Sequence, residues 1–261
     1  MSNELKFQTR DGIQRTLGYA FEKEDHDYLN SHGEDPKLLM KRFSDSFPSF
    51  NTDANPTDIL KIKNQGNVGA CQGFSLSTIF QICYFLATGR EEIFSAMAGY
   101  ILSQRYDNLL GKDVGSTLSA GEQVATEHGL CLDVDWKFPG RYDTTIPEGI
   151  QYPFKLKHST PTNDVAVLKE ADALGLPFHI GIPWGREMDA EYVDQFIGSG
   201  GGGHAVAHWL GNLINSWGPW NQDGMSKISD RALEQMCQHR WATFIIYAPD
   251  EMSFPDLEPI A

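Results

Sequence analysis

A cysteine that follows a glycine-punctuated loop is the residue of this sequence best suited to covalent chemistry. Cys71 lies within residues 63–75, where Gln65, Gly66 and Gly69 precede it and a long apolar run follows it. A thiol attacks a carbonyl carbon as the thiolate, and the positive end of a helix dipole lowers the pKa of a thiol placed there. We therefore predict a nucleophilic thiol at the start of a buried helix, with an imidazole from elsewhere in the fold as its base.

The candidate base and the group that orients it lie in two short blocks in the second half of the chain. Residues 200–206 are four glycines followed by His204, an alanine and a valine. Residues 213–218 carry Asn215 and Trp217. A histidine held in place by a third polar group is what a thiol nucleophile requires.

Taken in order, these blocks resemble the papain-like cysteine peptidases. They read Gln-Gly-x-x-Gly-x-Cys-x-x-Phe-Ser, then Gly-His-Ala-Val, then Asn-Ser-Trp-Gly. Weaker similarity connects them, since residues 113–116 resemble the substrate-binding loop of that family and residues 176–178 the strand that enters its β lobe. The resemblance extends over about residues 45–245, and three short motifs in the right order are more specific than any one of them alone.

The resemblance implies a role for each residue of the site. Cys71 would be the nucleophile, His204 the base that becomes an imidazolium, and Asn215 the acceptor that holds the ring. The side-chain amide of Gln65 and the backbone N–H of Cys71 would form an oxyanion hole. Trp217 would shield the His–Asn hydrogen bond from solvent. The implied reaction is acyl transfer, in which a thioester forms and water hydrolyses it.

Four residues are assigned to substrate binding on the same grounds. The backbones of Gly115 and Ser116 would pair with an extended polypeptide as an added strand, and Gly203 and Trp217 would line the cleft beside it. The glycine run 198–203 has two interpretations: a plain flexible loop, or glycines that allow a substrate backbone to approach closely.

Two departures from the family pattern concern the region around the nucleophile. Val68 stands where the family has a cysteine, so the disulfide of that family cannot form. Gln72 replaces the usual aromatic residue and leaves the nearby cleft wall undefined. No inhibitory helix of the family type is recognisable in residues 1–50, and our hypothesis is that this extension covers the cleft in another way.

A second histidine competes for the role of base. If the strands turn within residues 208–211, His204 faces Asn215; if residues 211–212 form a two-residue turn, His208 lies opposite Asn215. The Gly-His-Ala-Val match favours His204. The two histidines have the spacing of a helical zinc pair, but in a strand four residues span about 13 Å. We therefore predict no metal and no cofactor.

The elements that must position these groups divide the chain into a helical and a β half. This segregation predicts an α+β fold, and the resemblance makes it a papain-like two-lobed fold with the cleft between the lobes. We expect helices at about 37–43, from Cys71 to a Gly89 cap, 93–106, 117–128 with a Ser119/Glu122 capping box, and 165–174. We expect strands at about 151–156, 178–182, 204–210, 213–217 and 241–247.

Four segments follow from this division. They are an N-terminal extension (1–50), a helical lobe carrying Cys71 (51–160), a β lobe carrying His204 and Asn215 (161–250), and a tail (251–261).

Composition limits the partners of this 261-residue chain. A net charge of −14 disfavours nucleic acid and anionic membrane as partners, and no apolar run reaches the roughly 18–20 residues that cross a bilayer. The first ten residues lack the apolar core of a secretory signal. Four cysteines without a CxxC pair do not form a disulfide framework. We expect a cytoplasmic protein that acts on extended polypeptide, and its oligomeric state stays open.

The leading hypothesis is a cysteine peptidase, a hydrolase that cleaves peptide bonds. A related amidase or acyl transferase would use the same residues and is equally compatible with the motifs. A third hypothesis, motivated by Gln72 and by the short separation of His204 from Asn215, is a catalytically weak papain-like module that binds or assembles. Against it, a binding module has no need of all four residues of the site.

Overall fold

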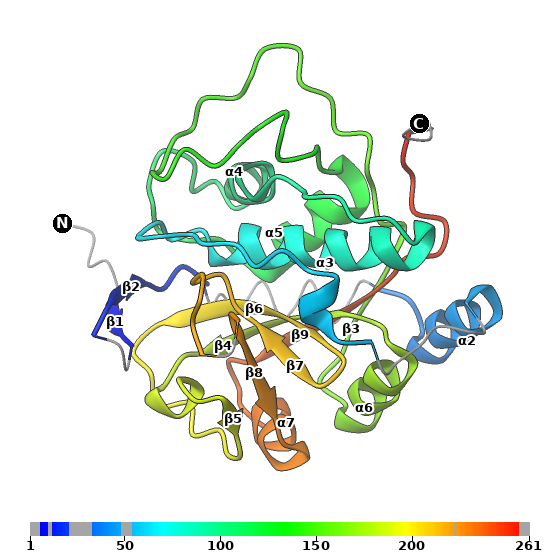
Figure 1. The fold of residues 1–261 in the computed structure, drawn as a ribbon, viewed down its shortest axis with the longest axis vertical. Helices are drawn as coiled ribbons and strands as arrows, with labels where there is room; N and C mark the ends of the chain where they lie inside the picture. Colours follow the sequence, from blue (N-terminus) through cyan, green and yellow to red (C-terminus); the bar gives the residue numbers. More distant parts are fainter. Residues whose placement is uncertain (1–5, 10–11, 21–32, 48–53, 222, 256–261) are drawn as a thin grey trace.

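Two layers make up the molecule, one of helices and one built on a β-sheet (Figure 1). A computed structural model describes residues 6–9, 12–20, 33–47, 54–221 and 223–255. The charge run at residues 22–27 and the end of the tail, residues 256–261, lie outside the described residues. The fold is α+β, as predicted.

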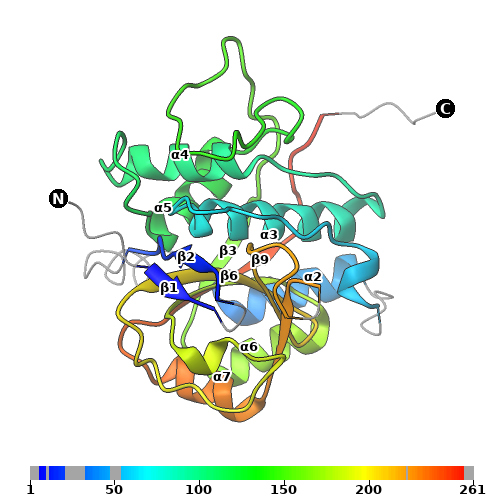
Figure 2. The same cartoon turned by 60° about the vertical axis from the view of Figure 1, so that its left-hand side comes forward.

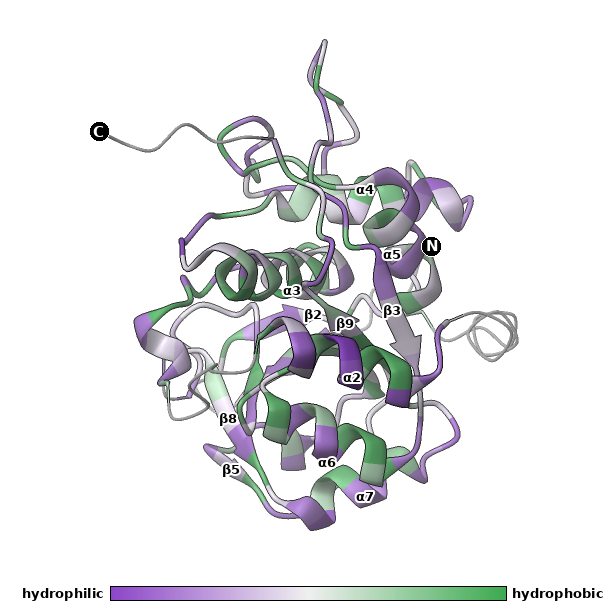
Figure 3. Cartoon of the chain, turned by 90° about the vertical axis from the view of Figure 1, so that its right-hand side faces the viewer, coloured by the Kyte–Doolittle hydropathy of each residue, from purple (hydrophilic) through white to green (hydrophobic). Residues whose placement is uncertain are grey.

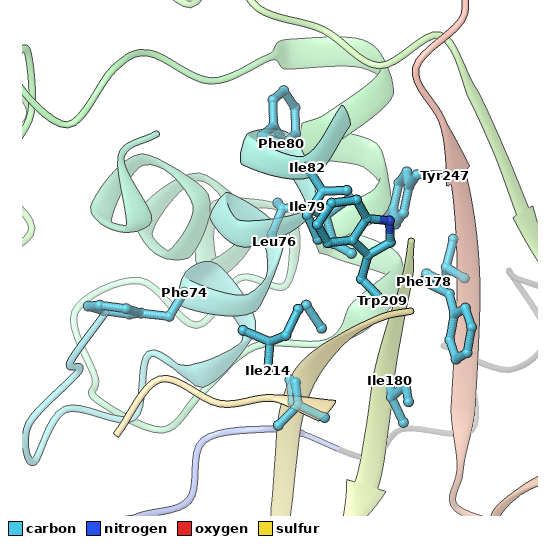
Figure 4. Close-up of a cluster of buried hydrophobic side chains, with 14 of the residues drawn as sticks. Phe74, Leu76, Ile79, Phe80, Ile82, Phe178, Ile180, Trp209, Ile214 and Tyr247 are labelled. Atoms are coloured by element: carbon cyan, nitrogen blue, oxygen red, sulfur yellow. The ribbon is translucent and has the colours of Figure 1, made fainter. Parts of the chain in front are cut away.

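Helix α3 (Cys71–Thr88) is the centre of the helical layer. It is apolar on nearly every side, and such a helix is stable only when it is covered all round. Gly89 ends it in the left-handed conformation with φ 70°, which confirms the predicted cap. Figure 4 shows apolar side chains of α3, among them Leu76 and Ile79, directed toward Trp209 and Ile214 of the sheet.

Helices α4 (Ala96–Tyr106) and α5 (Leu118–Gln123) complete this layer. A Cβ added to Gly73 of α3 would lie 2.4 Å from the backbone nitrogen of Tyr100, so the two helices cross in close contact because this glycine has no side chain.

The predicted Ser119/Glu122 capping box is wrong. Thr117 caps α5 by accepting a hydrogen bond from the Ala120 N–H at 3.1 Å. The Glu122 carboxylate instead accepts a hydrogen bond from the Ser159 hydroxyl at 2.7 Å. The helix continues through a π-helical turn, η2 (Val124–His128), to Gly129.

The sheet has seven strands in the order β3-β9-β4-β6-β7-β8-β5. It is antiparallel except for the short pair of β5 and β8. Its strands are β3 (His158–Pro161), β4 (Phe178–Pro183), β5 (Tyr192–Val193), β6 (Gly203–Trp209), β7 (Asn212–Ile214), β8 (Met225–Ile228) and β9 (Thr243–Ala248). The predicted strand 151–156 is wrong, because Phe154 and Lys155 form only isolated bridges. Strands β3, β5 and β8 were not predicted.

Three amphipathic helices cover the β layer away from α3 (Figure 3). They are α2 (Pro36–Ser46), α6 (Val165–Leu174) and α7 (Asp230–Cys237). Helix α2, predicted at about residues 37–43, begins with Pro36 at its first turn, and it packs on α6, β3 and β9. Short pieces complete the fold: the 3-10 turns η1 (Pro56–Asp58) and η3 (Arg186–Met188), and a hairpin of β1 (Lys6–Gln8) and β2 (Gln14–Thr16). Among the described helices, none is long and apolar enough to cross a membrane.

A buried histidine joins the two layers. The His179 Nε2 on β4 lies 2.5 Å from the Ser75 hydroxyl on α3, and its Nδ1 has no hydrogen-bond partner among the described residues. Burial lowers the pKa of His179 to about 3, so the ring is neutral in the folded protein at neutral pH.

We predict that the folded state weakens on acidification through this residue. The unfolded chain takes up a proton at His179 near pH 6.5 while the folded chain does not, so the stabilisation is complete above about pH 6.5 and is lost toward pH 3. Between pH 7 and pH 5 the free energy of unfolding should fall by about 2 kcal/mol from this group. Urea unfolding of wild type and His179→Gln at several pH values measures it.

The variant should show a flatter dependence on pH. The matched control is His239→Gln at a half-buried ring, which should keep most of the wild-type slope. Equal slopes for wild type and His179→Gln would contradict the assignment.

Candidate active site

The Cys71 thiol lies where the first turn of α3 meets β6, a central strand of the sheet. Cys71 is fully buried and is the first residue of the helix. Its Sγ accepts a hydrogen bond from the Ala205 N–H of β6 at 3.4 Å. The residue before Ala205 is His204, so this contact brings the candidate nucleophile and the candidate base to the same place.

His204 is held by the side chain that the motifs suggested. Its Nε2 lies 2.9 Å from the Asn215 Oδ1, which also accepts the Ser216 N–H at 2.7 Å. The Trp217 indole stacks on the imidazole with ring centroids 4.5 Å apart, and Trp184 contacts it edge-on at 4.6 Å. The Nδ1 of His204 is buried and has no hydrogen-bond partner among the described residues, which leaves that nitrogen available to a proton from a thiol.

The turn between β6 and β7 decides between the two histidines. It consists of Leu210 and Gly211, both with positive φ, and so lies within residues 208–211, the first of the two turns considered from the sequence. His208 therefore pairs with Leu213 in the ladder. Its ring stacks on Phe178 with centroids 4.1 Å apart, and it does not contact Asn215. The structure places His204, and not His208, beside Asn215.

Gln65 is fixed by a short backbone pairing with the segment that carries Asn215. The Gln65 N–H donates to the Ser216 carbonyl at 2.8 Å, and the Ser216 hydroxyl donates to the Gln65 Oε1 at 2.5 Å. The side-chain amide donates to the Val68 carbonyl at 2.8 Å and, more weakly, to the Thr16 carbonyl at 3.4 Å. The side-chain amide of Gln65, the predicted oxyanion donor, is thus present but already donates hydrogen bonds to backbone carbonyls.

A carboxylate positions the loop that was predicted to bind substrate. Asp113 accepts hydrogen bonds from the Gly69 N–H at 2.9 Å and from the Tyr100 hydroxyl at 2.8 Å. These bonds tie residues 113–116 to the loop before the nucleophile and to α4. Ser116 thereby faces the cleft opposite β6.

The cleft is occupied by the N-terminal extension. We call residues 12–20 the strap; with β1 they lie between the helices and the sheet (Figure 2). The Ser116 N–H donates to the Gly18 carbonyl at 3.1 Å, and the Ala20 N–H donates to the Ser116 carbonyl at 3.2 Å. The Tyr19 N–H donates to the Gly203 carbonyl at 3.0 Å. The strap therefore uses the backbone groups that we assigned to substrate, as hypothesised for the extension.

Glycines make this close approach possible. A Cβ on Gly18 would lie 1.9 Å from the Gly69 carbonyl oxygen, and a Cβ on Gly115 would lie 2.0 Å from the Gly18 carbonyl oxygen. Gly115 also has φ 91°, which other residues rarely adopt. Farther along the strap, the Arg15 guanidinium donates to the Trp217 carbonyl at 3.1 Å.

Burial sets the charge state of the site. It raises the pKa of the Cys71 thiol to about 11, against smaller lowering effects of backbone N–H groups that face the sulfur, Ala205 and Gly18 among them. Burial also lowers the pKa of His204 to about 4, although the hydrogen bond to Asn215 raises it. Both groups are therefore neutral at pH 7, whereas an activated thiol was expected. Desolvation disfavours each charged form, and it outweighs the helix dipole here.

The two residues that depart from the family pattern are both buried. Gln72 is buried in the helical layer, where its Nε2 lies 2.0 Å from the position of a Cβ on Gly121. Val68 is buried and supplies the carbonyl that holds Gln65. In the glycine run, Gly200 allows a close approach, since a Cβ there would overlap the Trp184 carbonyl. Gly203, the first residue of β6, accepts a hydrogen bond from the strap through its carbonyl.

Comparison with solved structures identifies the architecture. Xylellain, a cysteine protease from Xylella fastidiosa, matches with a TM-score of 0.63 and 17% identity, covering 95% of this chain and 99% of its own. The chain has a papain-like fold. The proform of Amb a 11, a cysteine protease and ragweed pollen allergen, matches at TM-score 0.59 and 18% identity, covering 73% of this chain and 62% of its own.

A third papain-like structure has an inhibitor bound. The Carica candamarcensis cysteine protease CMS1MS2 in complex with E-64 matches at TM-score 0.55 and 17% identity, covering 73% of this chain and 93% of its own. No protein-family model matches the chain, and no curated protein matches it significantly. At these identities the likeness establishes the papain-like fold, and the roles of individual residues have to be argued from the site itself.

In the part of the chain that the structure describes, no group of three or more His, Cys, Asp or Glu side chains is arranged to hold a metal ion. All four cysteines are free.

We predict that Gly18→Ala opens the site. The added methyl would overlap the Gly69 carbonyl, and because both partners are backbone-fixed, no side-chain rotation relieves the overlap. Alkylation of Cys71 by iodoacetamide, followed by mass spectrometry, should accelerate at least about tenfold, which corresponds to about 1.4 kcal/mol against the closed state. The pH at which alkylation reaches half of its maximal rate should also fall, because water returns to the thiol.

Gly201→Ala is the matched control. A methyl there meets nothing within 4 Å, so the rate should stay at the wild-type value. An unchanged rate in Gly18→Ala would show that the strap does not limit access to Cys71.

Proposed function

We propose that this chain is a cysteine peptidase in which Cys71 attacks the carbonyl carbon of a peptide bond. The observation that carries the proposal is the His204–Asn215 hydrogen bond under Trp217, on the strand whose next residue donates to the Cys71 sulfur. A structural histidine has no need of an orienting amide, a stacked indole and an open Nδ1 beside a buried thiol at a helix start.

The proposed reaction uses each group at a stated atom. The Cys71 thiol gives its proton to the His204 Nδ1, and the resulting imidazolium is stabilised by the Asn215 Oδ1 and by the indole face of Trp217. The thiolate attacks, and the oxyanion receives hydrogen bonds from the Gln65 side chain and the Cys71 N–H. His204 then protonates the leaving amine. A water molecule, deprotonated by His204, hydrolyses the thioester and frees the thiol.

We also propose that the strap keeps the enzyme at rest. Two observations support this role: the strap occupies the backbone partners on Ser116 and Gly203, and burial beneath it favours the uncharged thiol and imidazole. Displacement of the strap by an extended polypeptide would free these groups and restore water to the site. The four free cysteines support work in a reducing compartment such as the cytoplasm.

Peptide hydrolysis by full-length wild type and by Gly18→Ala tests the proposal. We expect turnover that is faster in Gly18→Ala. In that background Cys71→Ala should abolish it, and His204→Ala should lower kcat by about 10²–10⁴-fold. Gln65→Ala should cost about 10²–10³-fold. His208→Gln is the control and should stay within about twofold, since this ring contacts Phe178 and not Asn215.

Two other results would redirect the assignment. Products that carry an added amine nucleophile in place of water would indicate the related acyl transferase. Absence of turnover, with labelling of Cys71 in Gly18→Ala by an epoxide inhibitor no faster than that of a free thiol, would indicate the catalytically weak module and reject the peptidase.

A further inference from the structure

The strap fills a defined pocket in the sheet with the side chain of Tyr19. The side chain is only 5% exposed, although it belongs to a segment that crosses the surface of the cleft. Its hydroxyl donates a hydrogen bond to the Thr243 Oγ1 at 2.9 Å. An aromatic ring and a hydroxyl are thus both accommodated at this point.

Three neighbouring strands form the floor of this pocket. Gly181 of β4 lies directly between Ala205 of β6 and Thr243 of β9 in the ladder. Directly opposed residues of a sheet face the same side, so these three positions lie next to one another under the ring. A Cβ on Gly181 would lie 2.4–2.8 Å from the Cζ, Cε1 and Cε2 atoms of Tyr19. The absence of a side chain at Gly181 therefore creates the space for the ring.

The pocket adjoins the reacting groups. Ala205, at one side of the floor, donates its N–H to the Cys71 sulfur and directly follows His204. The Tyr19 N–H is bonded to the Gly203 carbonyl, and Ser116 bonds to the residues on either side of Tyr19. An extended chain that replaces the strap at these backbone positions brings one of its own side chains to the same pocket.

We propose that this pocket, with Gly181 and Thr243 as its determinants, selects an aromatic side chain of the polypeptide substrate and prefers tyrosine to phenylalanine. The proposal rests on the peptidase function proposed above. Tyr19 of the strap then acts as the internal mimic of the preferred substrate residue.

The preference follows from the surroundings of the Thr243 hydroxyl. Thr243 is 3% exposed, and in the described part of the chain the Tyr19 hydroxyl is the one hydrogen-bonding partner assigned to the Thr243 hydroxyl. A phenylalanine fills the same volume but leaves this hydroxyl without that partner, and a site built around a hydroxyl discriminates against the analogue that lacks it. Small aliphatic side chains leave the space above Gly181 unfilled.

A binding measurement tests the pocket without depending on catalysis. The probe is a series of synthetic peptides that are identical except for one position, scanned along the peptide and occupied by Tyr, Phe, Leu or Ala. The protein is full-length Tyr19→Ala, in which the pocket is vacated, with folding checked by circular dichroism. The readout is protection of Cys71 from alkylation by iodoacetamide.

At one peptide position, tyrosine should protect at a roughly five- to tenfold lower concentration than phenylalanine. Adding Thr243→Val should bring the Tyr/Phe ratio to about one. Adding Gly181→Ala should weaken the protection of Cys71 by the Tyr and Phe peptides and leave protection by the Ala peptide unchanged. Thr160→Val is the matched control: it removes another buried hydroxyl of the sheet, one that bonds the Glu34 carbonyl, and should keep the wild-type ratio.

Equal protection by the Tyr and Phe peptides, or a ratio unchanged by Thr243→Val, would overturn the proposal. If peptides are hydrolysed but Tyr and Phe peptides protect equally, the proposed pocket is rejected and the peptidase function stands. If Tyr peptides protect better but no peptide is hydrolysed, the peptidase function is rejected and the pocket stands.

If Tyr19→Ala does not fold, a double-mutant cycle in the otherwise intact chain replaces it. Tyr19→Phe should then speed Cys71 alkylation when Thr243 is present and have no effect in Thr243→Val. Equal effects of Tyr19→Phe in both backgrounds would overturn the proposal.

Discussion

Helix α3 must be covered on every side, and the arrangement of the whole molecule depends on that requirement. Its apolar surface is too extensive for one neighbour, so α4 packs on one side and strands β4 and β6 on the other. The first residue of the helix, Cys71, consequently lies at the seam of the two layers. Burial that stabilises the fold thus also determines where the Cys71 thiol meets the strand that carries the His204 imidazole.

Features encoded by local sequence could be predicted, because short-range physics determines them. The all-round apolar run ending at Gly89 predicted α3 correctly, and the motif around His204 predicted the histidine that contacts Asn215. Errors arose where several local patterns were possible. Ser119 is as good a cap as Thr117 by composition, and tertiary packing selected Thr117. Residues 151–156 alternate like a strand but find no adjacent strand to pair with along their length.

The sequence suggested that the N-terminal extension covers the cleft, but the residues that form the strap and its pocket could not be predicted, because they depend on contacts between distant parts of the chain. The residues from Gly12 to Ala20 have neither helical nor strand periodicity, and apart from the β1–β2 hairpin their partners lie some 50 to 220 positions away. Gly18 and Gly115 would each be read as ordinary turn glycines. Their function becomes visible only when two backbones are seen in contact. The same holds for Thr243, whose partner Tyr19 is at the opposite end of the sequence.

The strap is covalently part of the protein that it covers, and this has a thermodynamic consequence. A tethered segment competes for its site at an effective concentration that the tether sets, typically in the millimolar range for a short linker. Dilution does not lower that concentration, so the fraction of molecules with a closed cleft is the same in a dilute and in a concentrated solution. A free polypeptide gains access by exceeding the strap in affinity or by its own abundance. For the proposed peptidase, the occupied cleft therefore sets a threshold on substrate supply, one that each molecule carries within itself.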